Sequence, residues 1–500
     1  MAHEVVVVGG GVGGLTAAAL LAARGVDVCL LEKEAQAGGC AATFEKFGYR
    51  FESTASLYAG WGAGEIHERV FGELPVGPPE VRPARPSYVV RLPDMTEVAL
   101  AEDDEEFEKN LRAAFPECAE AAINFYREIE PIGAALRRAS ARVPDLATAS
   151  RIRRLRATAS EAAIAPRILA AMKTTTAAHL SQASLRFRRF IDAQLQIFAQ
   201  CPSEECAYLY ACVALGIARG GMHAIRGGAA ALTDALLASI VKSGGRVRLN
   251  APVLRLAFDG SGRAGGVDLL SGERVEATRA VISNLTVWDT YGKLVGLSRT
   301  PEEMRSRLKA LRGWGAYLLY LGMDEAAADG LPAERLLALT DWQEGQPYDA
   351  EAAQLMFAAA PPWDTRAPAG KRAVTVSTFT EASQWFGFHE DEAEHEAQDQ
   401  QVLEACWQRL HAAMPELGGQ VEVIETATPR TFYENTRRKL GMVGGLGQSL
   451  AVFGPNALTH RTAFPNLFLV GDSVFPGQGL AAVTHSALIV ANELAPPVKR

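Results

Sequence analysis

The 500-residue sequence contains no long hydrophobic run. Its most apolar internal stretch, CAYLYACVALGIA at residues 206–218, is too short to span a bilayer. The N-terminal stretch VVVVGGGVGG has no basic segment before it and is interrupted by glycines, so we expect no signal peptide. We therefore expect a cytoplasmic protein whose contact with a membrane, if any, is peripheral and on its inner face.

The sequence contains few cysteines, and it has fewer basic than acidic residues. The seven cysteines are odd in number and lack CxxC spacing, which predicts reduced thiols rather than disulfides. A net charge of −8 argues against a general nucleic-acid binder. His395 and His411 lack metal-ligand spacing, so we predict no metal site. Apolar residues make up 48% of the chain, enough for the cores of two or three domains.

The strongest motif lies near the N-terminus. Residues 5–8 are all valine and predict a buried parallel strand, residues 13–24 predict a close-packed helix, and residues 26–31 predict a second strand. The turn between the first strand and the helix has the spacing Gly-x-Gly-x-x-Gly. This order of strand, glycine turn, helix and strand is typical of a dinucleotide-binding unit.

Each residue of this turn has a separate physical role. Gly9 allows the tight turn, Gly11 lets a pyrophosphate approach the backbone, and Gly14 lets the helix pack against the strand. The helix N-terminus offers free N–H groups to the phosphates. Glu32 ends the second strand, where its carboxylate can accept both ribose hydroxyls and would repel the 2′-phosphate of NADP.

A second glycine turn favours FAD over NAD. Gly38 and Gly39 follow the second strand, where a plain NAD-dependent dehydrogenase usually has a helix. The next segment, TFEKFGYRFE, alternates like a strand pair around Gly48. There is no second GxGxxG, hence no sign of a separate NAD(P)H site. The extra loop suits a larger cofactor that lies extended across the domain.

Two later segments return to this domain. Residues 227–284 predict a glycine turn, an amphipathic helix, a strand through Val247 and Leu249, another strand from Val253, and a hairpin that ends at Asn284. Residues 467–470 predict a further parallel strand, followed by Gly471, Asp472 and a helix over 480–494. Ligands of open α/β sheets bind at the carboxyl ends of strands. Asp472 can therefore accept a ribityl hydroxyl, and the helix N-terminus can stabilise negative charge on a reduced flavin.

Several of these stretches resemble one family. The opening fingerprint, IRGGAAALTDAL (225–236), VISNLTVWDTYGKLVG (281–296), TPRTFYENTRRKLGMVGG (428–445) and GDSVFPGQG (471–479) are similar to the phytoene desaturase superfamily of FAD enzymes. The likeness is greatest to carotenoid cis–trans isomerases of the prolycopene isomerase type. It implies an α/β fold with an FAD-binding Rossmann-like domain, of the glutathione-reductase or amine-oxidase type, and a discontinuous α+β substrate domain.

The resemblance also implies domain limits and cofactor contacts. We assign residues 1–86, 221–300 and 426–500 to the FAD-binding domain, and 87–220 and 301–425 to the substrate domain. Strands over 87–100, 316–324 and 372–380 would form the second domain's sheet, with helices from about 101–219 on top. The resemblance implies FAD contacts at Gly9, Gly11, Gly14, Glu32, Gly38, Gly39, Val253, Gly471, Asp472, Gly479, Leu480 and Ala481. To these we add their neighbours Gly13, Lys33 and Asn284 as candidate cofactor-binding residues.

No catalytic side chain is assigned, because in this family the flavin itself does the chemistry. Where the family has Phe-Asp-x-Gly, this sequence has Phe51-Glu52-Ser53-Thr54. Glu52 is a candidate proton donor, and a loop-shaping carboxylate is the alternative. His485, six residues after Gly479, is a second candidate, with a packed helical histidine as the alternative.

Residues 137–189 are strongly basic in an otherwise acidic protein. They contain 12 arginines and lysines against two acids, Asp145 and Glu161, with aliphatic residues between them. Such a surface can hold an enzyme on anionic lipid, at about 1 kcal/mol for each well-placed basic residue. The alternative is a solvated helical face that pairs with acidic patches such as AEDDEEFEK at 101–109.

Three functions remain open at this point. The first is isomerisation of cis double bonds in a hydrophobic, carotenoid-like polyene, without net redox change and with reduced flavin. The second is an FAD-dependent desaturase or saturase of a carotenoid, isoprenoid or related polyene. The third is an amine-oxidase-like flavoenzyme, or a lipid-carrying flavoprotein without turnover. The sequence leaves the electron acceptor and the oligomeric state undetermined.

Overall fold

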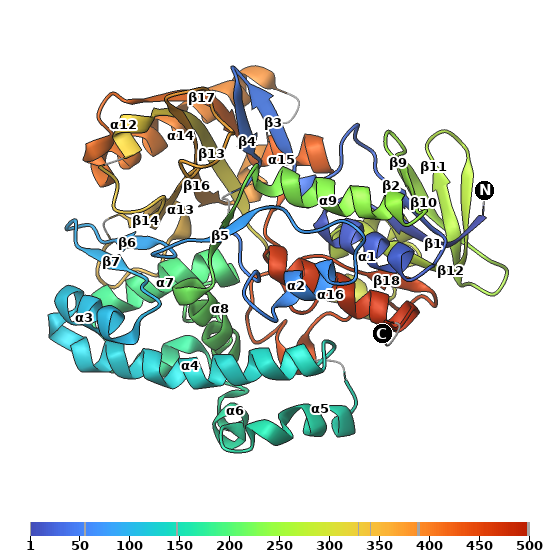
Figure 1. Cartoon of the computed structure of the whole chain (residues 1–500), viewed down its shortest axis with the longest axis horizontal. Helices are drawn as coiled ribbons and strands as arrows, with labels where there is room; N and C mark the ends of the chain where they lie inside the picture. Colours follow the sequence, from blue (N-terminus) through green and yellow to red (C-terminus); the bar gives the residue numbers. More distant parts are fainter. Residues whose placement is uncertain are drawn as a thin grey trace.

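The computed structural model describes residues 2–54, 57–146, 149–328, 330–340, 342–387 and 391–497. Within these residues two seven-stranded sheets lie side by side, with the first sheet on the right of Figure 1 and the second at the upper left. Helices cover both sheets, and a helical layer lies beneath the second sheet. The segments 2–31 and 467–494 meet at the first sheet although they lie at opposite ends of the chain.

The first sheet is built from three distant segments. Its order is β10-β11-β12-β1-β2-β9, and β18 pairs with the end of β12. The neighbours of β1 are both parallel to it, and β10, β11 and β12 form an antiparallel meander. The strands are β1 (Ala2–Val8), β2 (Val28–Leu31), β9 (Arg246–Arg248), β10 (Val253–Phe258), β11 (Ala264–Leu269), β12 (Arg274–Ser283) and β18 (Leu467–Leu469).

Three helices cover one face of this sheet. They are α1 (Val12–Ala23), α9 (Gly228–Lys242) and α16 (Leu480–Leu494). Val5 and Val7 of β1 point into the core that these helices share, and Val6 and Val8 point to the opposite face. Because successive side chains of a strand alternate, the valine run fills both faces, as a buried parallel strand requires.

The second sheet is mixed and follows the order β17-β13-β16-β15-β14-β6-β7. Alternate residues of β13 face two cores: Leu319 and Leu321 pack with α14 (Glu392–Ala413), and Leu318 and Tyr320 belong to a separate cluster that contains Phe51. The strands are β6 (Val89–Arg91), β7 (Glu97–Ala99), β13 (Gly315–Asp324), β14 (Arg335–Leu339), β15 (Gln354–Ala359), β16 (Lys371–Thr380) and β17 (Val421–Ala427).

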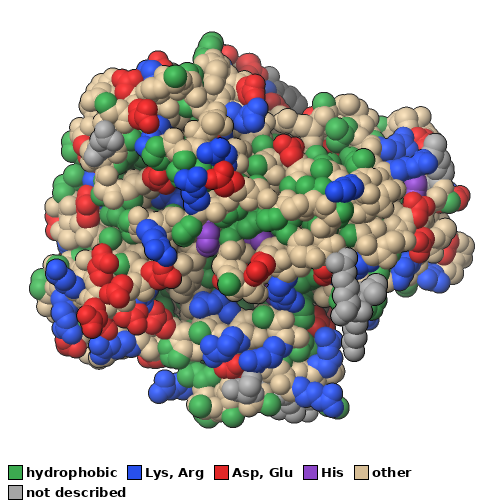
Figure 2. All heavy atoms as spheres, viewed as in Figure 1, with side chains coloured by type: hydrophobic (Ala, Val, Ile, Leu, Met, Phe, Trp, Pro, Cys, Tyr) green, Lys and Arg blue, Asp and Glu red, His purple; other side chains and the backbone are tan. Residues whose placement is uncertain are grey.

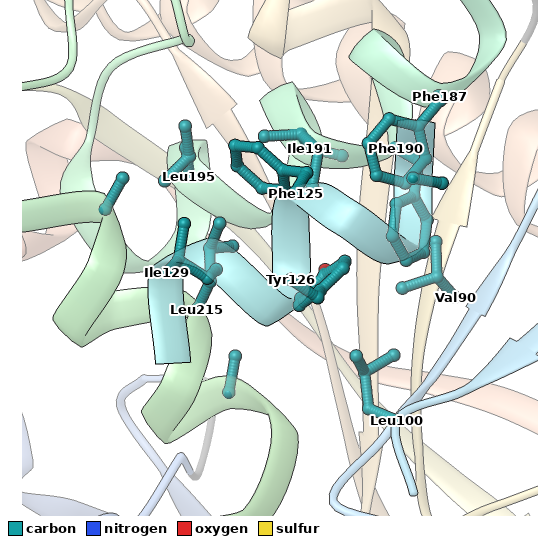
Figure 3. Close-up of a cluster of buried hydrophobic side chains, with 14 of the residues drawn as sticks. Val90, Leu100, Phe125, Tyr126, Ile129, Phe187, Phe190, Ile191, Leu195 and Leu215 are labelled. Atoms are coloured by element: carbon teal, nitrogen blue, oxygen red, sulfur yellow. The ribbon is translucent and has the colours of Figure 1, made fainter. Parts of the chain in front are cut away.

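A helical layer closes the molecule below the second sheet. Its core is rich in aromatic side chains, and Phe125, Tyr126, Phe187 and Phe190 lie together there (Figure 3). The helix α4 runs along the bottom of Figure 1, with α5 and α6 beneath it. The helices are α3 (Asp104–Ala114), α4 (Ala119–Arg142), α5 (Arg151–Thr158), α6 (Ala165–Ala171), α7 (Leu185–Ala199) and α8 (Tyr208–Gly220).

Short elements connect these layers. Two hairpin-like pairs stand apart from the large sheets, β3 with β4 and β5 with β8. Phe51 of β4 and Phe44 of β3 pack on Tyr320 of the second sheet. The remaining elements are β3 (Thr43–Lys46), β4 (Tyr49–Glu52), α2 (Ile66–Phe71), β5 (Val81–Pro83), β8 (His223–Ile225), α10 (Val287–Asp289), α11 (Glu302–Ala310), α12 (Glu325–Ala328), α13 (Ala350–Ala353) and α15 (Pro429–Thr436).

The predicted α/β architecture is confirmed, with small corrections at strand ends. The strand predicted from Val26 begins at Val28, and β9 ends at Arg248, before Leu249. The hairpin around Gly48 lies in the segment assigned to the cofactor domain, yet its aromatic side chains pack on the second sheet. The domain limits themselves stay a prediction. No helix in the described part of the chain combines the length and apolarity that a bilayer span needs.

Candidate functional site

One large cavity joins the two glycine turns that lie at opposite ends of the chain. Its volume is about 2800 Å³, and its wall includes Gly11 and Gly13 from the first turn and Gly471 and Gly479 from the last. Pockets for single small molecules are usually several hundred to about 1,000 Å³. The cavity therefore has room for an extended cofactor and a long substrate together.

The first turn is shaped by close contact between backbone atoms. Gly9 has a φ of +97°, a left-handed conformation that glycine adopts without strain. A Cβ atom on Gly14 would lie 2.1 Å from the carbonyl oxygen of Gly9, so only glycine lets α1 begin this close to β1. A Cβ atom on Gly13 would lie 3.2 Å from the backbone nitrogen of Gly471. The two distant turns are therefore direct neighbours.

Glu32 lies where the sequence predicted, at the end of β2 in the cavity wall. Its carboxylate accepts hydrogen bonds from the backbone N–H groups of Gly10, at 2.6 Å, and Glu34, at 3.0 Å. Burial raises the pKa of this carboxyl, although the hydrogen bond from Gly10 and the charge of Lys33 oppose that shift. Lys33 also lines the cavity, and its ammonium pairs with Glu34. These bonds fix the orientation of the Glu32 carboxylate in the cavity wall, and its contact with a ribose stays a prediction.

The second glycine turn closes over the first. The N–H of Gly38 donates to the carbonyl oxygen of Gly10 at 2.8 Å. Gly38 and Gly39 have φ values of +134° and +58°, and a Cβ atom on Gly38 would lie 2.9 Å from the Cα atom of Ala42. Both glycines line the cavity. The two glycines thus lie in the cavity wall, and their contact with a nucleotide stays a prediction.

The last turn brings the remaining predicted residues to the same cavity. Gly471 has a φ of +110°, and its N–H donates to the hydroxyl oxygen of Ser486 at 2.8 Å. Asn284 sits between the first and last turns, where its amide donates to the carbonyl oxygen of Gly9 at 3.4 Å. All the predicted cofactor residues except Gly14 line the cavity, namely Gly9, Gly11, Gly13, Glu32, Lys33, Gly38, Gly39, Val253, Asn284, Gly471, Asp472, Gly479, Leu480 and Ala481.

Sequence reasoning missed two supports of Asp472. The guanidinium of Arg438 donates to its carboxylate at 2.7 Å. A Cβ atom on Gly445 would lie 2.4 Å from the backbone oxygen of Asp472. Both residues belong to TPRTFYENTRRKLGMVGG, which the resemblance singled out without giving it a role. The glycines in this stretch could have indicated that its backbone packs closely against another segment.

The two weak catalytic candidates have well-defined partners. Glu52 is buried, pairs with the guanidinium of Arg366, and accepts the N–H of Ala229 at 2.7 Å. These contacts favour the loop-shaping alternative for Glu52. His485 lines the cavity and donates to the carbonyl oxygen of Pro144 at 3.0 Å. Burial lowers the pKa of His485 to about 4, which keeps its imidazole neutral near pH 7.

The other half of the cavity is mainly apolar. Beyond the glycine turns the cavity is lined by residues of α7, α8, the second sheet and the loop that contains Phe453. The side chains that face it here are Ile197, Phe198, Leu209, Tyr210, Val213, Leu318, Tyr320, Phe379 and Phe453. Such a wall excludes water and suits a long hydrophobic molecule.

The basic segment 137–189 is not a single surface. Arg189 of α7 is buried and pairs with Asp192, and Arg186 is half-buried and pairs with Asp94. Arg138 and Arg142 share Glu161. Among the described residues of this segment, exposed cations occur together with exposed large apolar residues around α5 and α6. Contact of this segment with a membrane stays a prediction.

The residues present fit FAD. The turns supply a positive helix end at α1, a carboxylate at Glu32, and glycine backbone that no side chain blocks. The cavity continues from there to Asp472 and the N-terminus of α16. Within the described residues, no cluster of histidine, cysteine and acidic side chains is arranged to hold a metal ion.

The fold and this cavity define an FAD-binding enzyme of the oxidoreductase type. A family model, described as flavin-containing amine oxidoreductase, matches residues 12–495, so the chain belongs to this family, and its cofactor is FAD. The chain is 26% identical to prolycopene isomerase of Arabidopsis thaliana over 99% of its own length and 82% of that protein. It is 24% identical to all-trans-retinol 13,14-reductase of Homo sapiens over 98% and 85% of the two chains.

A solved structure supports the same fold. An oxidoreductase from Methanosarcina mazei superposes with a TM-score of 0.64 at 18% identity, over 98% of this chain and 99% of the other. The sequence-based resemblance to the phytoene desaturase superfamily is confirmed by these findings together.

Proposed function

We propose that this protein converts cis double bonds of a hydrophobic, carotenoid-like polyene to trans, without net redox change and with reduced flavin. The observation that carries the proposal is the single cavity of about 2800 Å³ that runs from the glycine turns to an apolar chamber. The similarity to prolycopene isomerase along nearly the whole chain supports it.

The residues of this chain bind and orient the substrate. Ile197 and Phe198 of α7 and Leu209 of α8 line the apolar chamber and hold an extended chain away from water. Reduced flavin supplies an electron-rich ring that can transiently lower the order of a conjugated double bond. No side chain in this proposal accepts a substrate proton at the reacting bond. Glu52 and Arg366 instead fix the loop beside the cavity through their buried ion pair.

The test is anaerobic incubation of the FAD-loaded protein with a cis-polyene of the lycopene type, with and without dithionite. Chromatography should show conversion to trans only with dithionite, and mass spectrometry should show an unchanged mass. Conversion with oxidised flavin, or no conversion in either state, would contradict the proposal. Binding without conversion in both flavin states would instead indicate a lipid-carrying protein.

Reduction of the polyene is the second candidate function, because a retinol reductase also matches along nearly the whole chain. A saturase would raise the product mass by two hydrogens, and a desaturase would lower it by two. The same mass spectra therefore separate these reactions from isomerisation. An amine-oxidase-like activity would be seen as amine-dependent flavin reduction in the absence of any polyene.

We further propose that α5 and α6 dock on the inner face of an anionic membrane. Ile152, Leu169 and Met172 are exposed there, at 64%, 68% and 39%, although large apolar side chains are usually buried. Basic side chains gather around the same lobe at the bottom of Figure 2. Leu169 and Met172 also line the cavity, so a lipid-soluble substrate would pass directly from the bilayer into the protein.

Vesicle sedimentation tests this docking. The protein should pellet with phosphatidylglycerol vesicles at low salt and much less with phosphatidylcholine vesicles. Leu169→Ser should weaken binding to the anionic vesicles. Val241→Ser removes an equally exposed apolar side chain from α9 and should leave binding unchanged. Equal binding of both variants, or none by the parent protein, would refute the docking surface.

A further inference from the structure

Arg137 is a charged side chain in the cavity wall that forms no ion pair among the described residues. Arg137 lies on α4 and lines the cavity. Its Nη1 atom is shielded from water and makes no hydrogen bond, and no carboxylate in the described part of the chain forms an ion pair with it. Burial lowers the pKa of this guanidinium. An uncompensated charge of this kind costs free energy unless a ligand pairs with it.

The packing of α4 against α8 determines where this guanidinium lies. At Gly133 the helices approach so closely that a Cβ atom there would lie 2.2 Å from the carbonyl oxygen of Cys212. One turn further along both helices, a Cβ atom on Gly216 would lie 2.9 Å from Nη1 of Arg137. The absence of a side chain at Gly216 therefore makes the room in which the guanidinium sits.

The charged groups around Arg137 offset its charge only in part. Glu65 acts most strongly on it, and one oxygen of that carboxylate also accepts the N–H of Gly62 at 2.8 Å. Arg69 of α2 also lines the cavity and, within the described residues, forms no ion pair. By contrast, Arg138 lies beside Arg137 in the sequence and is paired with Glu161. The wall of the cavity thus carries guanidinium groups without an ion-pair partner among the described residues, while its lining elsewhere is mainly apolar.

We propose that the part of the cavity beside Arg137 binds the carboxylate of a polyene acid, with Arg137 as the positioning residue. The inference rests on the proposed function and narrows its substrate class from a plain hydrocarbon to a polyene with an acidic end group. A hydrocarbon end would leave the charge of this guanidinium without a partner, whereas a carboxylate can accept hydrogen bonds from the part of the guanidinium that faces the cavity. Anchoring one end also determines which double bond lies beside the flavin.

The test compares binding of parinaric acid, a fluorescent conjugated polyene acid, with binding of its methyl ester, in the absence of lipid. The FAD-loaded protein should prefer the acid. Arg137→Met should weaken binding of the acid about tenfold, equal to about 1.4 kcal/mol, and leave the ester within about twofold. Arg137→Lys should keep part of the preference. Arg138→Met, the matched control, should leave both affinities unchanged because Arg138 is already paired.

Several results would overturn the inference. Equal loss for acid and ester would mean that Arg137 only packs against the chain. Equal effects of Arg137→Met and Arg138→Met would mean that general charge, not this contact, attracts the acid. Loss of bound flavin in Arg137→Met would assign the side chain to the cofactor. Competition by a short-chain phosphatidic acid as strong as that by parinaric acid would identify the anion as a lipid headgroup.

These results are independent of turnover. If the protein prefers the acid and fails to isomerise any polyene, the carboxylate site stands and the proposed reaction falls. If it isomerises a hydrocarbon polyene and binds the acid no better than the ester, the reaction stands and the site falls.

Discussion

The guanidinium of Arg438 donates to the carboxylate of Asp472 at 2.7 Å, and both side chains are largely buried. This ion pair joins the loop after α15 to the loop after β18. It leaves Asp472 in the cavity wall but fixes one of its two oxygens. The residue expected to contact the ribityl chain is therefore positioned by a side chain 34 residues before it in the sequence.

Removal of this support should weaken FAD binding. We expect Arg438→Met to lower the affinity for FAD about tenfold and the free energy of unfolding by about 1–3 kcal/mol, because Asp472 loses its partner. Flavin absorbance after gel filtration measures the first effect. Arg127→Met, which removes a guanidinium paired with Glu108 away from the cavity, should keep its flavin. Equal flavin loss in both variants would contradict the prediction.

Gly14 should not tolerate even one added methyl group. In Gly14→Ala the new Cβ atom would lie 2.1 Å from the carbonyl oxygen of Gly9, so α1 must move away from β1. We expect a loss of about 1–3 kcal/mol in the free energy of unfolding and a flavin-free protein. Gly77→Ala is the control, because nothing lies within 4 Å of a Cβ atom there. A Gly14→Ala protein that purifies yellow would disprove this account of the turn.

Glu52→Gln distinguishes a structural carboxylate from a proton donor. The buried pair with Arg366 predicts a loss of about 3 kcal/mol in the free energy of unfolding, measured by urea denaturation. Turnover for each bound flavin should change little. The exposed pair Glu45–Arg50 lies on the same hairpin, and Glu45→Gln should cost less than about 0.5 kcal/mol. Unchanged stability with lost turnover would restore Glu52 as a catalytic residue.

Acid should destabilise the protein through two buried histidines. Burial lowers the pKa of His67 to about 3 and that of His460 to about 4, below the ordinary value of 6.5. Below pH 6.5 the unfolded chain then binds more protons than the folded one. Stability is fully present above pH 6.5 and falls as the pH drops toward the folded values, by about 1.4 kcal/mol per pH unit for each histidine.

Urea denaturation between pH 7 and pH 5 measures this slope. His67→Gln removes one titrating group and should reduce the slope by the share that His67 contributes. His411→Gln changes a histidine on α14 that is not buried, and the slope should stay unchanged. A His67→Gln protein with the parent's pH dependence would mean that His67 does not titrate as described.

The sequence correctly predicted helices, strands and turns whose pattern involves residues close together along the chain. The valine run, the glycine spacing and the helix over 480–494 each involve neighbours along the chain, and all appear in the structure. Cavity-lining residues such as Glu32 and Asp472 were found for the same reason, since they follow strands directly. Arg438 and Gly445 were missed because their partner is Asp472, which no local pattern connects to them.

The sequence by itself determined the alternation of strands and helices and the glycine positions where backbone must approach backbone. These depend on side-chain period and on the lack of a Cβ atom. Only the tertiary structure decided which charged side chains form ion pairs. Arg137 and Arg138 are neighbours in the chain and both line the cavity, yet among the described residues Arg137 forms no ion pair and Arg138 pairs with Glu161. The packing of α4 against α8 makes that difference, because successive residues of a helix point about 100° apart.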